Sequence, residues 1–182
     1  HLIYNNFARE NRLKLQIKKQ FEHYLAPAMV KKLQNNPELL KLGGDTRDMT
    51  FLFCDIRGFT PISEKYQSNP QGLTKVINKF LTPMTDIIMK NNGTIDKYMG
   101  DCIMAFWNAP LNQHNHRSLA VDSAIEMIKC LKELNDNEHF GEGNHINIGI
   151  GINSGPAVVG NMGSKQRFDY SVLGDAVNLA SR

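Results

Sequence analysis

The chain has 182 residues, which suits one domain with a shorter appended segment. Hydrophobic residues make up 41% and charged residues 21%, a composition that excludes a disordered chain. The net charge of +3 is too small to indicate nucleic-acid binding, so we expect no nucleic-acid partner.

Three cysteines without a Cys-x-x-Cys spacing indicate neither a disulfide framework nor a zinc site, and they predict a reducing compartment. No apolar run reaches the roughly 18 residues of a membrane span, and no signal peptide is present. We therefore expect a cytoplasmic protein. Basic residues crowd its start, which leaves open that it is the cytoplasmic portion of a membrane-anchored protein: Arg9, Arg12, Lys14, Lys18 and Lys19.

The chain begins with a helical segment. Apolar residues recur at loose helical spacing from about residue 8 to 34 and are interrupted at Pro27, which predicts a connecting helix and a short second one. Turn formers from Asn35 to Asp48 then mark a boundary, so we divide the chain into a helical linker over 1–48 and a main domain over 49–182. Two roles are open for the linker: pairing with a second copy through Leu13, Ile17 and Tyr24, or packing on its own domain.

The main domain alternates between strand and helix patterns. An apolar strand is expected over 49–54, an amphipathic helix over 73–88, and a hairpin whose strands cover 94–99 and 102–107. A second helix follows, with an apolar face made of Ala120, Val121, Ala124, Ile125, Ile128, Leu131 and Leu134. A strand over 146–152 carries glycines on one face, where a helix or another backbone can approach closely.

Weaker strand patterns cover 157–159 and 169–173. The order predicts an α+β fold with a ferredoxin-like βαββαβ arrangement, a mixed sheet, and helices on one side of it. The final residues, VNLASR, are typical of an unfinished helix, and together with His1 at the start they predict a fragment open at both ends.

Two carboxylates occupy strand ends. Asp55 follows the first strand, and Asp101 lies in the hairpin turn. If the first strand lies beside the hairpin, both can meet, and magnesium prefers a few carboxylate oxygens completed by water and substrate phosphates. The alternative for either residue alone is a turn former or a helix cap.

Gly58, Phe59 and Thr60 come directly after Asp55, and Ser63 is a candidate cap for a helix that starts there. Backbone N–H groups at a helix start favour an anion, which would place substrate phosphates beside the metal. The chain has no GxxxxGK[ST] segment, so it is not a P-loop enzyme. His114 and His116 lack partners at metal-ligand spacing and are expected on the surface.

Four segments resemble the successive motifs of the class III nucleotide cyclase catalytic domain, the family that makes cyclic AMP or cyclic GMP: FCDIRGFT, IDKYMGDCIMAFW, NIGIGINSGPAVVGNMG and FDYSVLGDAVNLASR. The resemblance covers Met49 to Arg182, and QFEHYLAPAMV before it resembles the helical lead-in of bacterial members. It implies that Asp55 and Asp101 hold two Mg²⁺ or Mn²⁺ ions, with the Ile56 carbonyl assisting one.

The same resemblance implies roles for four further residues. Lys97 and Ser171 match the two purine-selecting positions, Asn178 the asparagine that orients the ribose, and Arg182 the arginine that stabilises charge on the α-phosphate. Asn178 and Arg182 are four apart, so one helix face would present both. Active sites in this family form between two subunits, so the resemblance implies a homodimer. It also implies an upstream sensor domain in the full-length chain and a catalytic domain that continues beyond Arg182.

Hydrogen bonding favours ATP as the substrate. Adenine presents an acceptor at N1 and a donor at N6, and a lysine that donates and a serine that accepts can read both. Guanylyl members use a glutamate and a cysteine at the two purine-selecting positions, where this chain has Lys97 and Ser171. Ser171 departs from the aspartate of many adenylyl members and the threonine of a bacterial branch, so selectivity is expected to be looser. The alternatives are a guanylyl cyclase or a catalytically silent cyclase-like module that dimerises.

Overall fold

The computed structural model describes residues 2–39, 44–164 and 168–182. Part of the expected boundary segment, residues 40–43, lies outside the described residues. Within the described chain, five strands form one sheet: β1 (Asp45–Arg57), β2 (Thr94–Met99), β3 (Cys102–Trp107), β4 (Asn147–Gly163) and β5 (Phe168–Leu173). The helices are α1 (Leu2–Phe21), α2 (Pro27–Asn35), the short 3₁₀ helix η1 (Pro37–Leu39), α3 (Phe59–Lys65), α4 (Pro70–Lys90), α5 (His116–Asp136) and α6 (Asp175–Ala180).

The expected α+β fold is confirmed, with the strand order β2-β3-β1-β4-β5. Each of the four pairings is antiparallel, so the sheet is not mixed as expected. The reason is that β3 lies between β1 and β2, the two strands that the α4 crossover joins in the same direction. The register pairs Cys54 with Ile103, which brings the end of β1 beside the β2–β3 turn.

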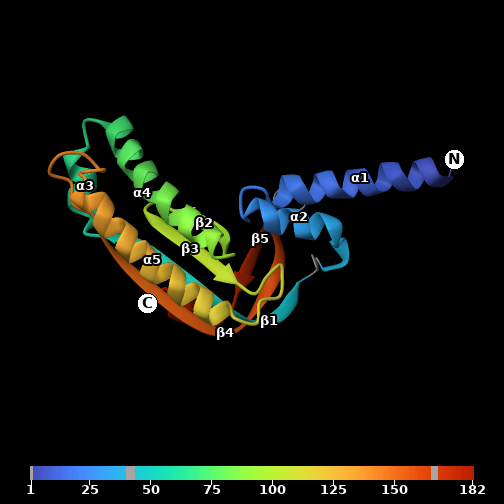
Figure 1. The fold of residues 1–182 in the computed structure, drawn as a ribbon. Helices are drawn as coiled ribbons and strands as arrows, with labels where there is room; N and C mark the ends of the chain where they lie inside the picture. The colour runs from blue at the N-terminus through green and yellow to red at the C-terminus, as the bar shows by residue number, and fades with distance from the viewer. Residues whose placement is uncertain (1, 40–43, 165–167) are drawn as a thin grey trace.

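Helices cover both faces of the sheet, rather than one as expected. On one face, α5 packs on β1 and α4 on β2 and β3, over a core that includes the alternate β1 residues Leu52 and Cys54. On the other face, α1, α2 and α6 share a second core with Met49 and Phe51. Figure 1 shows α4 and α5 side by side along the sheet and α1 and α2 at its opposite end. Successive β1 side chains therefore point to opposite faces of the sheet and contribute to two different cores.

The apolar face of α5 is narrower than expected. Ala120, Ala124 and Leu131 are buried, together with Met127. Val121, Ile125 and Ile128, by contrast, are about half exposed. They form a second series rotated by about 100° from the buried one, because successive helical residues advance by that angle.

The N-terminal helices pack on the sheet of their own chain. Ile17, one of the residues considered for pairing between copies, is 2% exposed, whereas Leu13 is 41% exposed. The Gln20 amide donates to Asn161 Oδ1 of β4 at 2.8 Å. The first half of α1 projects away from the rest of the molecule (Figure 1). No helix in the described part of the chain is long and apolar enough to cross a membrane.

The turn between α1 and α2, which we call the elbow (residues 21–25), contacts two strands. The ring of Phe21 packs edge-on against Tyr170 of β5 with centroids 5.3 Å apart. The carbonyl of Tyr24 accepts a hydrogen bond from the backbone N–H of Ile95 in β2 at 3.0 Å. The elbow therefore joins β2 and β5, the two edge strands of the sheet.

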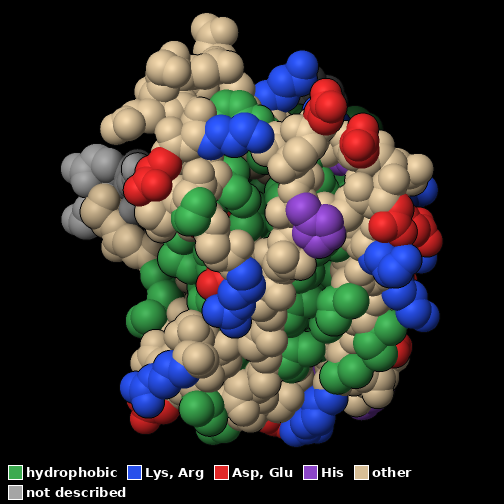
Figure 2. Space-filling view, turned by 90° about the vertical axis from the view of Figure 1, so that its left-hand side faces the viewer, with side chains coloured by type: hydrophobic (Ala, Val, Ile, Leu, Met, Phe, Trp, Pro, Cys, Tyr) green, Lys and Arg blue, Asp and Glu red, His purple; other side chains and the backbone are tan. Residues whose placement is uncertain are grey.

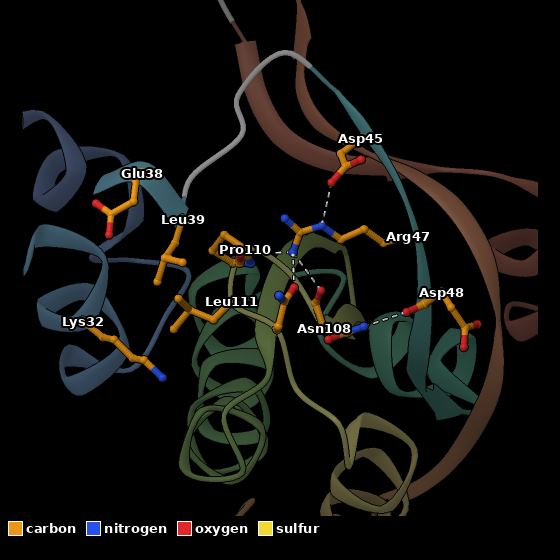
Figure 3. A pocket seen from close by; sticks show the side chains of 10 residues that line it. Lys32, Glu38, Leu39, Asp45, Arg47, Asp48, Asn108, Pro110 and Leu111 are labelled. Carbon is orange, nitrogen blue, oxygen red and sulfur yellow. Dashed lines mark hydrogen bonds and ion pairs between the residues drawn. The ribbon is translucent and has the colours of Figure 1, made fainter. Parts of the chain in front are cut away.

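A cavity of about 490 Å³ lies between the helical segment and the sheet (Figure 3). Lys32 and Glu38 border it from the helical side, and Arg47 of β1 from the other. Arg47 is ion-paired with Asp45 at 3.1 Å and donates to the carbonyl oxygens of Asn108 and Pro110 at 3.2 and 3.1 Å. Arg47 thus anchors the loop that follows β3 to β1, because one guanidinium pairs with Asp45 of β1 and also donates hydrogen bonds to two carbonyl groups of that loop.

Charged side chains of both signs are dispersed over the face at the left-hand side of Figure 1, which Figure 2 shows directly. Hydrophobic side chains lie open between them. This face therefore produces no single-sign electrostatic field.

His116 is buried, and its expected surface position is wrong; His114 is exposed as expected. His116 Nδ1 lies 2.7 Å from the Thr50 hydroxyl, which lies 2.7 Å from the Ser154 hydroxyl. Asp48 lies 3.9 Å from His116 Nε2. Burial and then the neighbouring Arg117 lower the pKa of His116, and Asp48 opposes them. Sequence spacing missed this network because its members come from β1, β4 and α5.

This network predicts a loss of stability in mild acid. Because the pKa of His116 is lower in the folded chain, the unfolded chain binds the proton more readily, and stability falls as the pH drops below about 6.5. His116→Asn keeps an acceptor for Thr50 but does not titrate there. Urea unfolding should therefore show a smaller acid-induced loss in His116→Asn than in wild type, and His114→Asn serves as the control. Equal pH dependence in all three proteins would contradict the prediction.

Candidate active site

The two predicted carboxylates come together at one end of the sheet. Asp55 lies near the end of β1, and Asp101 lies in the turn between β2 and β3. Asp101 Oδ2 accepts a hydrogen bond from the backbone N–H of Ile56 at 3.0 Å. The hairpin turn is therefore held against the residue that follows Asp55, as the reasoning from strand ends expected.

The residues around this pair fit a hard divalent cation. The Asp55 side chain is 48% exposed, so one side is open to a ligand. Burial, followed by the charges of Asp55 and Asp101, raises the pKa of the Cys102 thiol, so this neighbour stays neutral. No group of three or more His, Cys, Asp or Glu that could hold a metal occurs among the described residues. Two carboxylates suit Mg²⁺ or Mn²⁺, which complete their coordination with water and phosphate oxygens.

Four of the predicted residues line one cavity of about 560 Å³: Asp55, Lys97, Asn178 and Arg182. Its floor is formed by the glycine face of β4, at Gly149 and Gly151. The other predicted residues do not line this cavity: Ile56, Gly58, Phe59, Thr60, Asp101 and Ser171. One cavity therefore joins a candidate metal ligand to candidate base, ribose and phosphate contacts.

Lys97 and Ser171 are linked through a third residue, Asp96. The Ser171 hydroxyl donates to both carboxylate oxygens of Asp96, at 3.0 and 2.8 Å, and the Lys97 ammonium lies 3.7 Å from Oδ1. The Asp96 side chain is 1% exposed. Burial raises the pKa of Asp96, while the Ser171 hydrogen bond and the Lys97 charge oppose that rise. The structural hydrogen bonds of Asp96 therefore connect the two predicted purine-selecting positions.

The segment after Asp55 turns sharply into α3. Gly58 has φ 63°, a left-handed conformation that favours glycine, and α3 starts at Phe59. Ser63 does not cap this helix: it lies inside α3, and its hydroxyl donates to the Thr60 carbonyl at 2.8 Å. The phosphate-binding role of Gly58, Phe59 and Thr60 stays a prediction.

The last helix packs on the glycine face of β4, as expected for a strand with such a face. A Cβ on Gly151 would overlap the carbonyl oxygen of Ala180, and one on Gly155 would lie 2.9 Å from the Ala176 Cβ. Asn178 lies in α6, but α6 ends at Ala180, so Arg182 lies two residues beyond it. The expected common helix face is therefore wrong, although both residues line the cavity.

Gly151→Ala should displace α6 and with it Asn178. The new methyl group would meet backbone at Ala180, which cannot rotate away as a side chain can. We expect kcat/KM for the substrate that this cavity binds to fall by about 10²-fold, since a shift of about 1 Å in a positioning group has that effect. The matched variant Gly149→Ala meets only the flexible Arg57 guanidinium and should lose less. A Gly151→Ala protein with wild-type kcat/KM would contradict this role.

Arg57 is a cavity residue that sequence reasoning missed. Its guanidinium lies over Gly149, where a Cβ would stand, and its Nε lies 3.9 Å from Asp55 Oδ1. The side chain is 67% exposed and lines the cavity. Gly149 is the sequence feature that could have indicated Arg57, because a glycine has no side chain and leaves room for the long Arg57 side chain of the neighbouring strand.

Residues 44–182 match the family model described as the adenylate and guanylate cyclase catalytic domain. The chain belongs to this cyclase family. An adenylate cyclase of Anabaena cylindrica is 40% identical over 141 residues, which are 75% of this chain and 27% of that protein. This cyclase chain thus spans about a quarter of the length of that curated relative.

Two solved cyclase structures are similar to this cyclase domain. The guanylyl cyclase Cya2 has a TM-score of 0.71 and 42% identity, covering 77% of this chain and 70% of that one. The adenylyl cyclase CyaB from P. aeruginosa has a TM-score of 0.72 and 40% identity, covering 78% and 72%. Relatives of both nucleotide specificities are therefore equally similar, and the choice of base has to be argued from side chains.

Proposed function

We propose that this protein is an adenylyl cyclase, which converts ATP to cyclic AMP and pyrophosphate. The observation that carries the proposal is the cavity lined by Asp55, Lys97, Asn178 and Arg182, with Asp101 held beside it through Ile56. The adenylate cyclase of Anabaena cylindrica, 40% identical, supports it.

In the proposed reaction, the ribose 3′-oxygen attacks the α-phosphorus. The bond from the α-phosphorus to the oxygen that bridges to the β-phosphate breaks, pyrophosphate leaves with that oxygen, and the hydroxyl proton passes to water. Asn178 holds the ribose in line for this attack. Arg182 donates its planar, permanently charged guanidinium to the α-phosphate oxygens as charge develops on them.

Asp55 and Asp101 would hold two Mg²⁺ or Mn²⁺ ions, assisted by the Ile56 carbonyl. When bound, these ions lower the pKa of the 3′-hydroxyl and offset the negative charge of the phosphates. Gly58, Phe59 and Thr60 would present backbone N–H groups to the leaving phosphates. Lys97 would donate to adenine N1, and Ser171 would accept from the N6 amino group.

We also propose a homodimer whose two active sites form at the subunit interface, and a signal-transmitting segment over 1–48 that connects an upstream sensor to a catalytic domain over 49–182. The greater length of the curated relatives supports further domains in the complete protein. Mixing an Asp101 variant with an Arg182 variant tests whether the active sites are shared between subunits.

The test is turnover of ATP and of GTP by the purified protein, with Mg²⁺ and with Mn²⁺. Cyclic AMP as the main product supports the proposal. Cyclic GMP as the main product would favour a guanylyl cyclase. We keep this second candidate because the guanylyl cyclase Cya2 is 42% identical to this chain. If neither cyclic nucleotide forms while the protein dimerises, it is a silent cyclase-like module.

A further inference from the structure

Asp96 is placed to control the Ser171 hydroxyl. The pairing between β2 and β3 shifts register between Ile95 and Lys97, so Asp96 is the extra residue of a β-bulge. A bulge re-aims the side chain at its position. Here Asp96 points to the interior and meets Ser171 of β5, while the next residue, Lys97, lines the cavity. This hydrogen bond joins the two edge strands of the sheet.

The contact uses the only hydrogen that the Ser171 hydroxyl can donate. A hydroxyl has one donor and two acceptor lone pairs, and a carboxylate accepts only. The Ser171 oxygen lies 3.0 and 2.8 Å from the two Asp96 oxygens, so its hydrogen is directed to that carboxylate. The Lys97 ammonium lies 3.7 Å from Asp96, and its positive charge favours the anionic form of this carboxylate against the opposing effect of burial.

We propose that Asp96 is a positioning residue that fixes Ser171 as an acceptor-only group, and that this makes the site select ATP over GTP. The inference rests on the proposed function. An acceptor at Ser171 pairs with the N6 amino group of adenine, but it faces the O6 acceptor of guanine without a hydrogen between them. A serine free to rotate would accommodate both bases. Asp96 therefore supplies the polarity that an aspartate at position 171 would supply directly, and selectivity is not loosened by the serine.

The decisive variant is Asp96→Asn, which keeps the shape of the side chain. Its amide can donate to Ser171, and the serine hydrogen is then free to turn towards O6 of guanine. The ratio of kcat/KM for ATP to that for GTP should fall by about tenfold or more. A loss of stability alone would lower both activities and leave the ratio unchanged, so the ratio separates positioning from folding.

A double-mutant cycle tests whether Asp96 acts through Ser171. In a Ser171→Ala background, Asp96→Asn should leave the ratio unchanged within about twofold, because the group it positions is absent. If Asp96→Asn does not fold, as judged by circular dichroism, Asp96→Ser carries the same expectation. The wild-type protein offers a measurement without any variant: purine riboside triphosphate lacks the N6 amino group and should be turned over about tenfold less efficiently than ATP.

An unchanged ratio in folded Asp96→Asn, or equal turnover of ATP and purine riboside triphosphate by wild type, overturns the inference while the cyclase activity stands. A wild-type protein that forms neither cyclic nucleotide overturns the proposed function itself. The two failures are therefore distinguishable from the wild-type assay alone.

Discussion

Asp101→Asn is expected to lower the rate of cyclic AMP formation on the order of 10³-fold, with either Mg²⁺ or Mn²⁺. The change removes the negative charge that a hard cation requires. An asparagine oxygen can still accept the hydrogen bond that the Ile56 N–H now donates to Asp101 at 3.0 Å, so the turn keeps its place. The loss therefore reports the charge rather than the geometry of the hairpin.

Asp55→Asn should have a comparable effect, because Asp55 is the cavity-lining member of the pair. The control is Asp122→Asn, the same substitution at an exposed position of α5, which should retain wild-type activity. Folding of all three variants is checked by circular dichroism. If folded Asp101→Asn turns over ATP at the wild-type rate, Asp101 does not hold a metal required for the reaction.

Arg182→Ala is expected to lower kcat about 10³-fold or more, the effect typical of removing an arginine that stabilises phosphoryl-transfer charge. Arg182→Lys should recover only part of this, since a lysine supplies the charge without the planar pair of donors. The KM for ATP should change less than kcat, because the contact strengthens as charge develops in the transition state.

Mixing two inactive chains tests whether each active site is shared between subunits. A dimer of one Asp101→Asn chain and one Arg182→Ala chain contains one site with both residues intact, if metal ligands and arginine come from opposite subunits. Random mixing makes half of the dimers hybrid, so about a quarter of wild-type activity should return. No recovery would mean that each site uses Asp101 and Arg182 of the same chain, as the cavity of a single chain would also allow.

The local parts of this structure could be predicted from sequence. Both hairpin strands begin and end at the expected residues, because the turn at Gly100 and Asp101 and the flanking apolar runs are short-range signals. The meeting of Asp55 and Asp101 followed from strand order, and the close approach of α6 followed from the glycines of β4. These inferences needed only neighbouring residues and one correct strand pairing.

The features that could not be predicted depend on residues far apart in the chain. Polar residues at the start of β1 gave no strand signal, yet Asp45 to Asp48 pair with β4 and lengthen β1 to 13 residues. The burial of His116 depends on Thr50, and the bulge at Asp96 points to a partner 75 residues away. Periodicity reports which face of an element is apolar, but not which partner a buried polar group will find.

The elbow between α1 and α2 connects the proposed signal-transmitting segment to the sheet at a defined place. Its Tyr24 carbonyl binds Ile95, the residue before Asp96, and its Phe21 ring packs on Tyr170, the residue before Ser171. We therefore expect a displacement of α1 to move the two strands that carry Asp96 and Ser171. Asp55, at the far end of β1, has no such direct contact with the elbow among the described residues, so we expect a displacement of α1 to change the KM for the nucleotide before it changes kcat.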